Sequence, residues 1–166
     1  MPQTTAATAG VECDVEISTN GSTWLNLSGS ITMVEVPEQE RMTGVGYTFE
    51  GDVGIVTSGK RVPVEVRVTG LYTEESGEAY ESIRTHFQAP GGTRIYFRYS
   101  PLGIGEAGRK VFTASNDGTT AGAVVVNKFK LPDPNAGAAD PLPFFWTMLV
   151  PAFVETDTGS STGLGS

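Results

Sequence analysis

The sequence predicts a mainly β fold, a β-sandwich or barrel of antiparallel strands with one short α-helix inserted between two of them. Residues 62–69 and 94–99 alternate apolar with polar side chains, the period-two pattern of strands that bury one face. Between them lies a stripe of apolar residues spaced three and four apart, as on one face of a helix at about 75–88: Ala79, Tyr80, Ile83 and Phe87. The 21 glycines and 10 prolines supply the many turns that such a fold needs.

Length and charge narrow the function classes. A chain of 166 residues, 39% of them hydrophobic, suits one domain with a real core. The 19 acidic residues outnumber the 11 basic ones, and a net charge of −8 offers no basic face for binding DNA through its phosphates. No apolar run approaches the length of a membrane span, so we expect no membrane binding by this chain. The first ten residues lack the apolar region of a secretory signal, which predicts synthesis in a reducing cytoplasm.

The strands are expected to form a single β-rich domain at 11–154. A flexible N-terminal tail at 1–10 precedes it and a flexible C-terminal tail at 155–166 follows, since neither segment has an apolar pattern to bury. Besides the two strands named above, strands are expected at 11–18, 24–27, 31–36, 110–115, 123–131 and 144–154. Asn20-Gly21 predicts a tight hairpin turn between the first two of these.

Residues 37–60 form one long stretch with a looser pattern. It combines five glycines, mixed charges and scattered large apolar residues. A structureless connection of this length is uncommon inside a compact domain, so the stretch is either a functional loop or itself a long hairpin. We expect an arm that docks on another copy of the protein. The alternative is an ordinary excursion that lies on its own domain.

The expected helix has conventional signals at both ends. Thr73 or Ser76 can cap its start, and the glutamates around them suit the positive end of the helix dipole. Pro90, followed by two glycines, ends it.

One glycine motif matches a nucleotide-binding pattern by letters alone. Residues 103–108 read Gly-Ile-Gly-Glu-Ala-Gly, which fits the dinucleotide fingerprint. That motif requires a helix directly afterwards, whose N-terminus receives the pyrophosphate. Here the following residues, 109–113, continue as a strand. The sequence therefore predicts a hairpin loop, with no cofactor.

Residues with catalytic or metal-binding chemistry are few. His86 is the only histidine and Cys13 the only cysteine, so the sequence offers too few residues for a zinc site of the usual type and a single candidate base for a Ser-His-Asp triad. Two clusters of acidic and amide residues remain. Glu12, Asp14 and Glu16 alternate as on the solvent-exposed face of a strand. Asp133, Asn135 and Asp140 lack the spacing of a known calcium-binding loop. We expect no catalytic, metal or cofactor site, and no enzyme.

The order of these parts resembles the tail tube (major tail) protein of long-tailed bacteriophages. That family is related in fold to the tube proteins of contractile tails and of type VI secretion. The resemblance is carried by residues 14–24, by the arm at 34–60 and above all by 64–74 with the helix that follows. Together with the closing strand these stretches span most of residues 11–154.

The resemblance implies a structural virion protein in the phage tail, made in the cytoplasm of a bacterial host. Such proteins form hexameric rings whose strands join edge to edge, and the rings stack into a tube. The implied partners are other copies of the chain, the tape measure protein and the tail terminator, with double-stranded DNA only in transit during ejection. An acidic bore would let DNA slide instead of holding it.

Two groups of residues follow as expected assembly and bore positions. The arm contacts are Arg41, Tyr47, Phe49 and Lys60. The acidic residues expected to face the bore, on the basis of their alternation, are Glu12, Asp14, Glu16 and Glu65.

Two rival functions share the composition. A carbohydrate-binding β-sandwich module would use Trp24 and Trp146 as sugar platforms. A capsid decoration or head-tail joining protein would also be β-rich and lack catalytic residues. Ring number and stacking separate these virion proteins, because only a tube protein forms extended stacks.

Overall fold

The computed structural model describes residues 10–90, 94–137 and 139–158. One α-helix, α1 (Ala79–Gln88), and one 3-10 turn, η1 (Gly10–Glu12), accompany the strands. The strands are β1 (Asp14–Ser18), β2 (Leu25–Asn26), β3 (Ile31–Glu35), β4 (Glu40–Gly46), β5 (Ile55–Val62), β6 (Val64–Leu71), β7 (Arg94–Ser100), β8 (Lys110–Ser115), β9 (Val124–Lys130), β10 (Pro143–Val150) and β11 (Ala152–Asp157).

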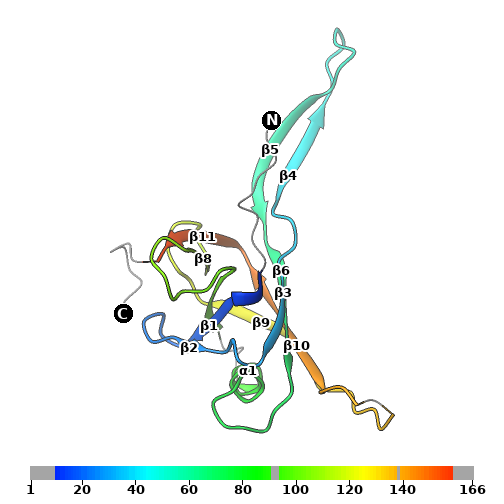
Figure 1. Cartoon of the computed structure of the whole chain (residues 1–166). Coiled ribbons are helices and arrows are strands. Elements are labelled where there is room, and N and C mark those ends of the chain that lie inside the picture. The colour runs from blue at the N-terminus through cyan, green and yellow to red at the C-terminus, as the bar shows by residue number, and fades with distance from the viewer. Residues whose placement is uncertain (1–9, 91–93, 138, 159–166) are drawn as a thin grey trace, which may run out of the picture.

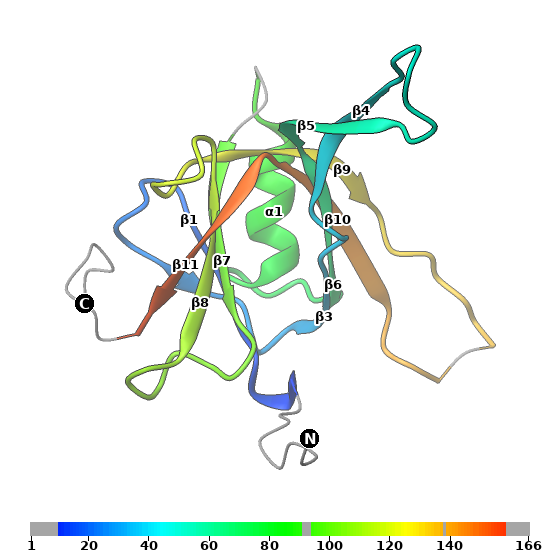
Figure 2. The same ribbon diagram turned by 90° about the horizontal axis from the view of Figure 1, so that it is seen from above.

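Nine of the strands form a single antiparallel sheet that curls around the core without closing (Figure 1, Figure 2). Its strand order is β11-β8-β7-β9-β10-β6-β3, and β1 and β2 branch from β7. β7 pairs with three strands: its first two residues pair with β9, and residues further along pair with β1 and β8. The expected mainly β fold with one inserted helix is confirmed.

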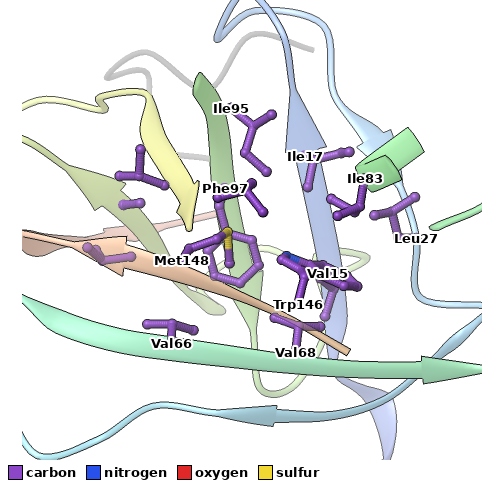
Figure 3. Close-up of a cluster of buried hydrophobic side chains, with 14 of the residues drawn as sticks. Val15, Ile17, Leu27, Val66, Val68, Ile83, Ile95, Phe97, Trp146 and Met148 are labelled. Carbon is purple, nitrogen blue, oxygen red and sulfur yellow. The ribbon is translucent and has the colours of Figure 1, made fainter. Parts of the chain in front are cut away.

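The core lies inside this curled sheet (Figure 3). Trp146, Phe97 and Met148 are fully buried at its centre. The predicted alternation in β6 is confirmed, since Val64, Val66 and Val68 point inward and the residues between them face out. Phe97 and Ile95 do the same from β7.

Helix α1 covers one opening of the sheet (Figure 2). Ala79 and Ile83 are fully buried, as their spacing predicts, and Tyr80 packs edge-on against Phe144 of β10. The helix begins later than expected. Its N-cap is Glu78, which makes no side-chain capping bond, so the expected cap by Thr73 or Ser76 is wrong. The Thr73 hydroxyl instead donates to the Glu78 carboxylate.

Two expected strands have different bounds. Residues 10–12 form η1, so the first strand starts only at Asp14. The long apolar run at 144–154 is two strands, β10 and β11, which separate at Pro151. Proline cannot donate to a ladder, and the chain leaves one part of the sheet there to join another. β11 reaches Asp157, three residues beyond the expected end of the domain at 154. The structure of 1–9 and 159–166 lies outside the described residues.

The arm is a long hairpin. β4 and β5 form a separate two-stranded sheet that projects away from the rest of the molecule (Figure 1). Every residue of β4 is exposed, and so is every residue of β5 except Val62. The arm therefore does not lie on its own domain.

Replacing Ile83 with alanine should destabilise the fold by about 2–5 kcal/mol, the usual cost of removing a buried Ile side chain. Ile83 is fully buried where α1 meets the core. Chemical denaturation followed by tryptophan fluorescence measures the change.

Phe49→Ala is the matched control, because Phe49 is fully exposed on the arm. It should change the free energy of unfolding by no more than about 0.5 kcal/mol. Equal losses in both variants would contradict the placement of α1 on the core.

Candidate assembly surfaces

The arm presents large apolar side chains to solvent. Phe49 and Tyr47, at its tip, are 112% and 76% exposed. Other exposed apolar residues of the arm are Met42, Val45, Val53, Ile55 and Val56. Apolar surface gathered on a projecting element is typical of an interaction site. The four expected arm residues, Arg41, Tyr47, Phe49 and Lys60, all lie exposed on this hairpin.

Local packing explains why the arm closes as a hairpin. Val45 pairs with Val56 across the ribbon, and Gly46 pairs with Ile55 next to the turn. A Cβ added at Gly54 would lie 2.9 Å from a methyl carbon of Val45 and 3.1 Å from the Tyr47 ring. Glycine at this position therefore lets the Tyr47 ring lie against the opposite strand.

The main strand path of the sheet ends at two open edges. Within the described residues, β3 pairs only with β6 and β11 pairs only with β8, and the two-residue strand β2, off this path, pairs only with β1. An edge strand presents unpaired N–H and C=O groups and is a template for pairing with another chain. Beside β3, a groove of about 560 Å³ separates it from β1. Its lining includes Cys13, Ile31, Met33, Val34 and Tyr99.

The three acidic residues near the N-terminus have different surroundings. Glu12 is exposed on η1. Asp14 accepts hydrogen bonds from the Ile104 backbone N–H at 2.7 Å, the Ser28 hydroxyl at 3.0 Å and the Asn26 side chain at 3.3 Å. Partial burial alone would raise the pKa of Asp14, but these hydrogen bonds outweigh it and lower the pKa. Asp14 thus ties the loop after β7 to β1.

Glu16 forms an ion pair with the nearly buried Arg98 of β7, whose guanidinium lies 4.1 Å from the centre of the Trp24 ring. Asp14 and Glu16 therefore each hold β1 to another part of the chain, Asp14 to the loop after β7 and Glu16 to Arg98 of β7.

Glu65 lies on a different part of the sheet. It faces outward from β6 and pairs with Lys128 of β9 at 2.5 Å. Arg67, two residues along the same strand, lies 3.7 Å from the centre of the Phe145 ring. β10, β9 and β7 separate β6 from β1 in the sheet, so Glu65 lies apart from the acidic residues of η1 and β1.

The candidate chemical groups do not assemble into a site. Among the described residues, no three His, Cys, Asp or Glu side chains come together as a metal centre would require. Asp133 pairs with Lys130, and the Asn135 side-chain oxygen accepts from the Gly137 N–H. Burial lowers the pKa of His86, so the neutral imidazole is favoured.

The glycine motif is a hairpin loop, as predicted. Residues 103–108 connect the antiparallel strands β7 and β8. Gly103 has a φ of +82°, and an added Cβ would lie 2.9 Å from the Glu12 carbonyl oxygen. These glycines therefore serve a tight turn and close backbone packing.

Sequence reasoning missed three features. The open edges of β3 and β11 depend on pairings between distant segments. Arg61 lies directly opposite Arg41 on the arm, a register that the sequence does not reveal because a bulge intervenes between Arg41 and Thr43. The third feature is a repeated turn: Ser18-Thr19-Asn20-Gly21 and Ser115-Asn116-Asp117-Gly118 have the same serine-to-backbone bonds and a positive-φ glycine. The shared Ser-x-Asn/Asp-Gly letters were its signal.

Neither a family model nor a curated protein matches this sequence. Solved structures do match its fold. A chain of an extracellular contractile injection system, the PVC sheath-tube complex in its extended state, aligns over 92% of this chain and 94% of its own, with a TM-score of 0.68 and 10% identity. The cap of the anti-feeding prophage, described as an AFP tube terminating cap, aligns over 95% and 96%, with a TM-score of 0.66 and 9% identity.

A chain from the tail of an empty gene transfer agent particle, whose structure has C6 symmetry, aligns over 90% of this chain and 99% of its own. Its TM-score is 0.60 at 11% identity. The similarity covers almost the whole of each chain, so it concerns the complete fold and not one part of it. This chain has the fold of the tail tube proteins.

The observed structure leaves no exposed tryptophan platform for a sugar. Trp146 is fully buried in the core. Trp24 is half-buried, and the Arg98 guanidinium lies over its ring. Trp146 therefore cannot serve the carbohydrate-binding alternative, and the Trp24 ring is partly covered by Arg98.

Asp14→Asn should destabilise the protein most above pH 3.8, the ordinary pKa of an aspartate. Folding lowers this pKa, so the ionised carboxylate stabilises the fold above 3.8, and that contribution is lost as pH falls through the folded pKa. Unfolding curves of both proteins across the acid range measure the difference.

Glu12→Gln removes one charge from an exposed side chain and should leave stability within about 0.5 kcal/mol of wild type. A stability difference between wild type and D14N that does not shrink in acid would contradict the role of the Asp14 carboxylate.

Proposed function

We propose that this protein is the structural subunit of a phage-type tail tube. Copies form hexameric rings, the rings stack, and the resulting tube conducts DNA during ejection. The observation that carries the proposal is a projecting hairpin with an apolar tip on a body that has two open sheet edges. In a monomeric protein each of these features promotes aggregation, whereas in an assembling protein each provides a contact surface.

Ring formation follows from the position of the edges. β3 and β11 lie at opposite ends of the strand order, so β3 of one copy can pair with β11 of the next. Such a contact joins two different surfaces, and repeated contacts of this kind form a ring when the rotation closes. The C6 symmetry of the gene transfer agent tail supports a ring of six.

The tube places the protein in a virion tail, made in the cytoplasm of a bacterial host. Its partners are other copies of itself and other tail proteins such as the tape measure and the tail terminator. It acts as a structural protein and not as an enzyme. Within the part of the chain that the structure describes, no helix has both the length and the apolar character needed to cross a membrane.

A capsid decoration or head-tail joining role is the second candidate, because open edges and an arm also suit those proteins. Negative-stain microscopy separates the candidates. A tube subunit forms extended stacks at high concentration, a joining protein a single ring, and a decoration protein trimers or monomers.

Shortening the arm should abolish tubes without unfolding the body. Replacing residues 42–60 with Asn-Gly joins Arg41 to Arg61, which already face each other across the ribbon, by a two-residue hairpin turn. The variant should melt as wild type does, because the exposed arm adds little to the core. Negative-stain microscopy measures tube formation. Normal tubes from this variant would show that the arm is not needed for assembly.

The acidic bore gives a separate prediction. Glu12 is the member of the expected bore set that is exposed and makes no ion pair among the described residues, because Asp14 and Glu16 hold contacts of β1 and Glu65 pairs with Lys128. E12K particles should assemble but eject DNA more slowly, because a positive charge on the wall attracts phosphate. Ejection is measured by the release of a DNA-binding dye. Wild-type ejection rates in E12K particles would refute the assignment of Glu12 to the bore.

A further inference from the structure

The segments next to the two ends of β6 carry opposite charge, Arg41 and Arg61 at one end and Glu74 and Glu75 at the other. β6 is eight residues long, which spans about 25 Å at the rise of an extended strand. The arm enters at Val64, and residues 72–78 leave at Leu71 toward α1, at the opposite end of the body (Figure 1). When the arm end of one copy contacts the α1 end of another copy, the two copies point in the same direction.

The arm end carries a pair of arginines. Arg41 and Arg61 are direct cross-strand partners, and both are exposed. Like charges placed directly opposite each other destabilise a ribbon. Within the described residues, no carboxylate lies within 4.0 Å of either guanidinium; Arg41 donates only to the Gly59 carbonyl, at 3.3 Å.

The two arginines line a groove. It has a volume of about 390 Å³, and Glu40, Val62 and Pro151 also contribute to its lining. Its one carboxylate, that of Glu40, leaves a net positive lining. A planar guanidinium is well suited to holding a carboxylate through two parallel hydrogen bonds.

The opposite end carries glutamates. Glu74 and Glu75 are exposed in the segment before α1, and Glu78 follows at its N-cap. Glu74 accepts a hydrogen bond from the Tyr72 hydroxyl at 2.9 Å, and no ion pair involves these three residues within the described part of the chain. The neighbouring charges are already neutralised, because Arg84 pairs with Glu81 and Lys130 with Asp133.

We propose that the arginine groove at the base of the arm holds Glu74 and Glu75 of a second copy, in the next ring of the stack. This inference rests on the proposed tube. Charge complementarity selects the occupant. Arg41 and Arg61 form no ion pair among the described residues, and the exposed carboxylates near the other end of β6 form none either. Because the two surfaces differ, the contact repeats without limit along one axis and sets the direction of stacking.

Charge exchange tests the contact. R41E/R61E and E74R/E75R should each raise the critical concentration for stacking by about tenfold or more, because each places like charges against each other. The quadruple variant keeps the wild-type net charge of −8 and should stack as wild type does, since both partners are exchanged. Mixing the two double variants should also restore stacks. Light scattering and negative-stain microscopy measure stacking, and circular dichroism checks folding.

E12R/D140R is the matched control. It changes the net charge as much as E74R/E75R does, at exposed positions that form no ion pair among the described residues and lie outside both surfaces, and it should stack normally. If wild type forms no stacks, the proposed function itself fails. If wild type stacks but the quadruple variant and the mixture do not, only the contact is wrong. Loss of duplex-DNA binding by R41E/R61E with unchanged stacking would assign the groove to phosphate and overturn the proposal.

Discussion

The constraint on which the rest depends is that the nine-stranded sheet does not close. A curled sheet surrounds the core on most sides, but its path ends at β3 and β11. Backbone groups at those edges need partners, and water satisfies them only while the edges remain isolated. The body therefore has a complete core but leaves backbone hydrogen-bonding groups unpaired at these edges. In the proposed tube, edge pairing between copies satisfies these backbone groups.

Stability and assembly are assigned to different parts of the chain. The core is continuous, and the inward-facing side chains of β6, β7, β10 and α1 are buried in it. The arm adds exposed apolar side chains and takes no part in that core. Residues 40–62 are thus free to match a partner surface, because changing them costs the body little. The same separation makes the arm variants clean tests of assembly, because they leave the packed core of one copy unchanged.

Local patterns predicted much of the fold. The alternation in β6 and the three-and-four spacing in α1 depend on neighbours in sequence, and both are correct. The sequence could not show pairings that join distant segments. Glu16 alternates like a solvated residue, yet it meets Arg98, 82 residues away. The Asp14 carboxylate accepts from an N–H 90 residues away. The apolar run at 144–154 hid the change of neighbour at Pro151, and the Arg41–Arg61 register depends on a bulge.

The continuity of β6 has a mechanical consequence. Only Pro63 separates the arm from the start of this strand, and all eight residues of β6 pair with β10. Tension applied to the arm along the strand loads the whole ladder at once, in shear, whereas tension across it would break the bonds one after another. In the proposed tube, tension passed along the arm would be borne by the full β6–β10 ladder of each subunit.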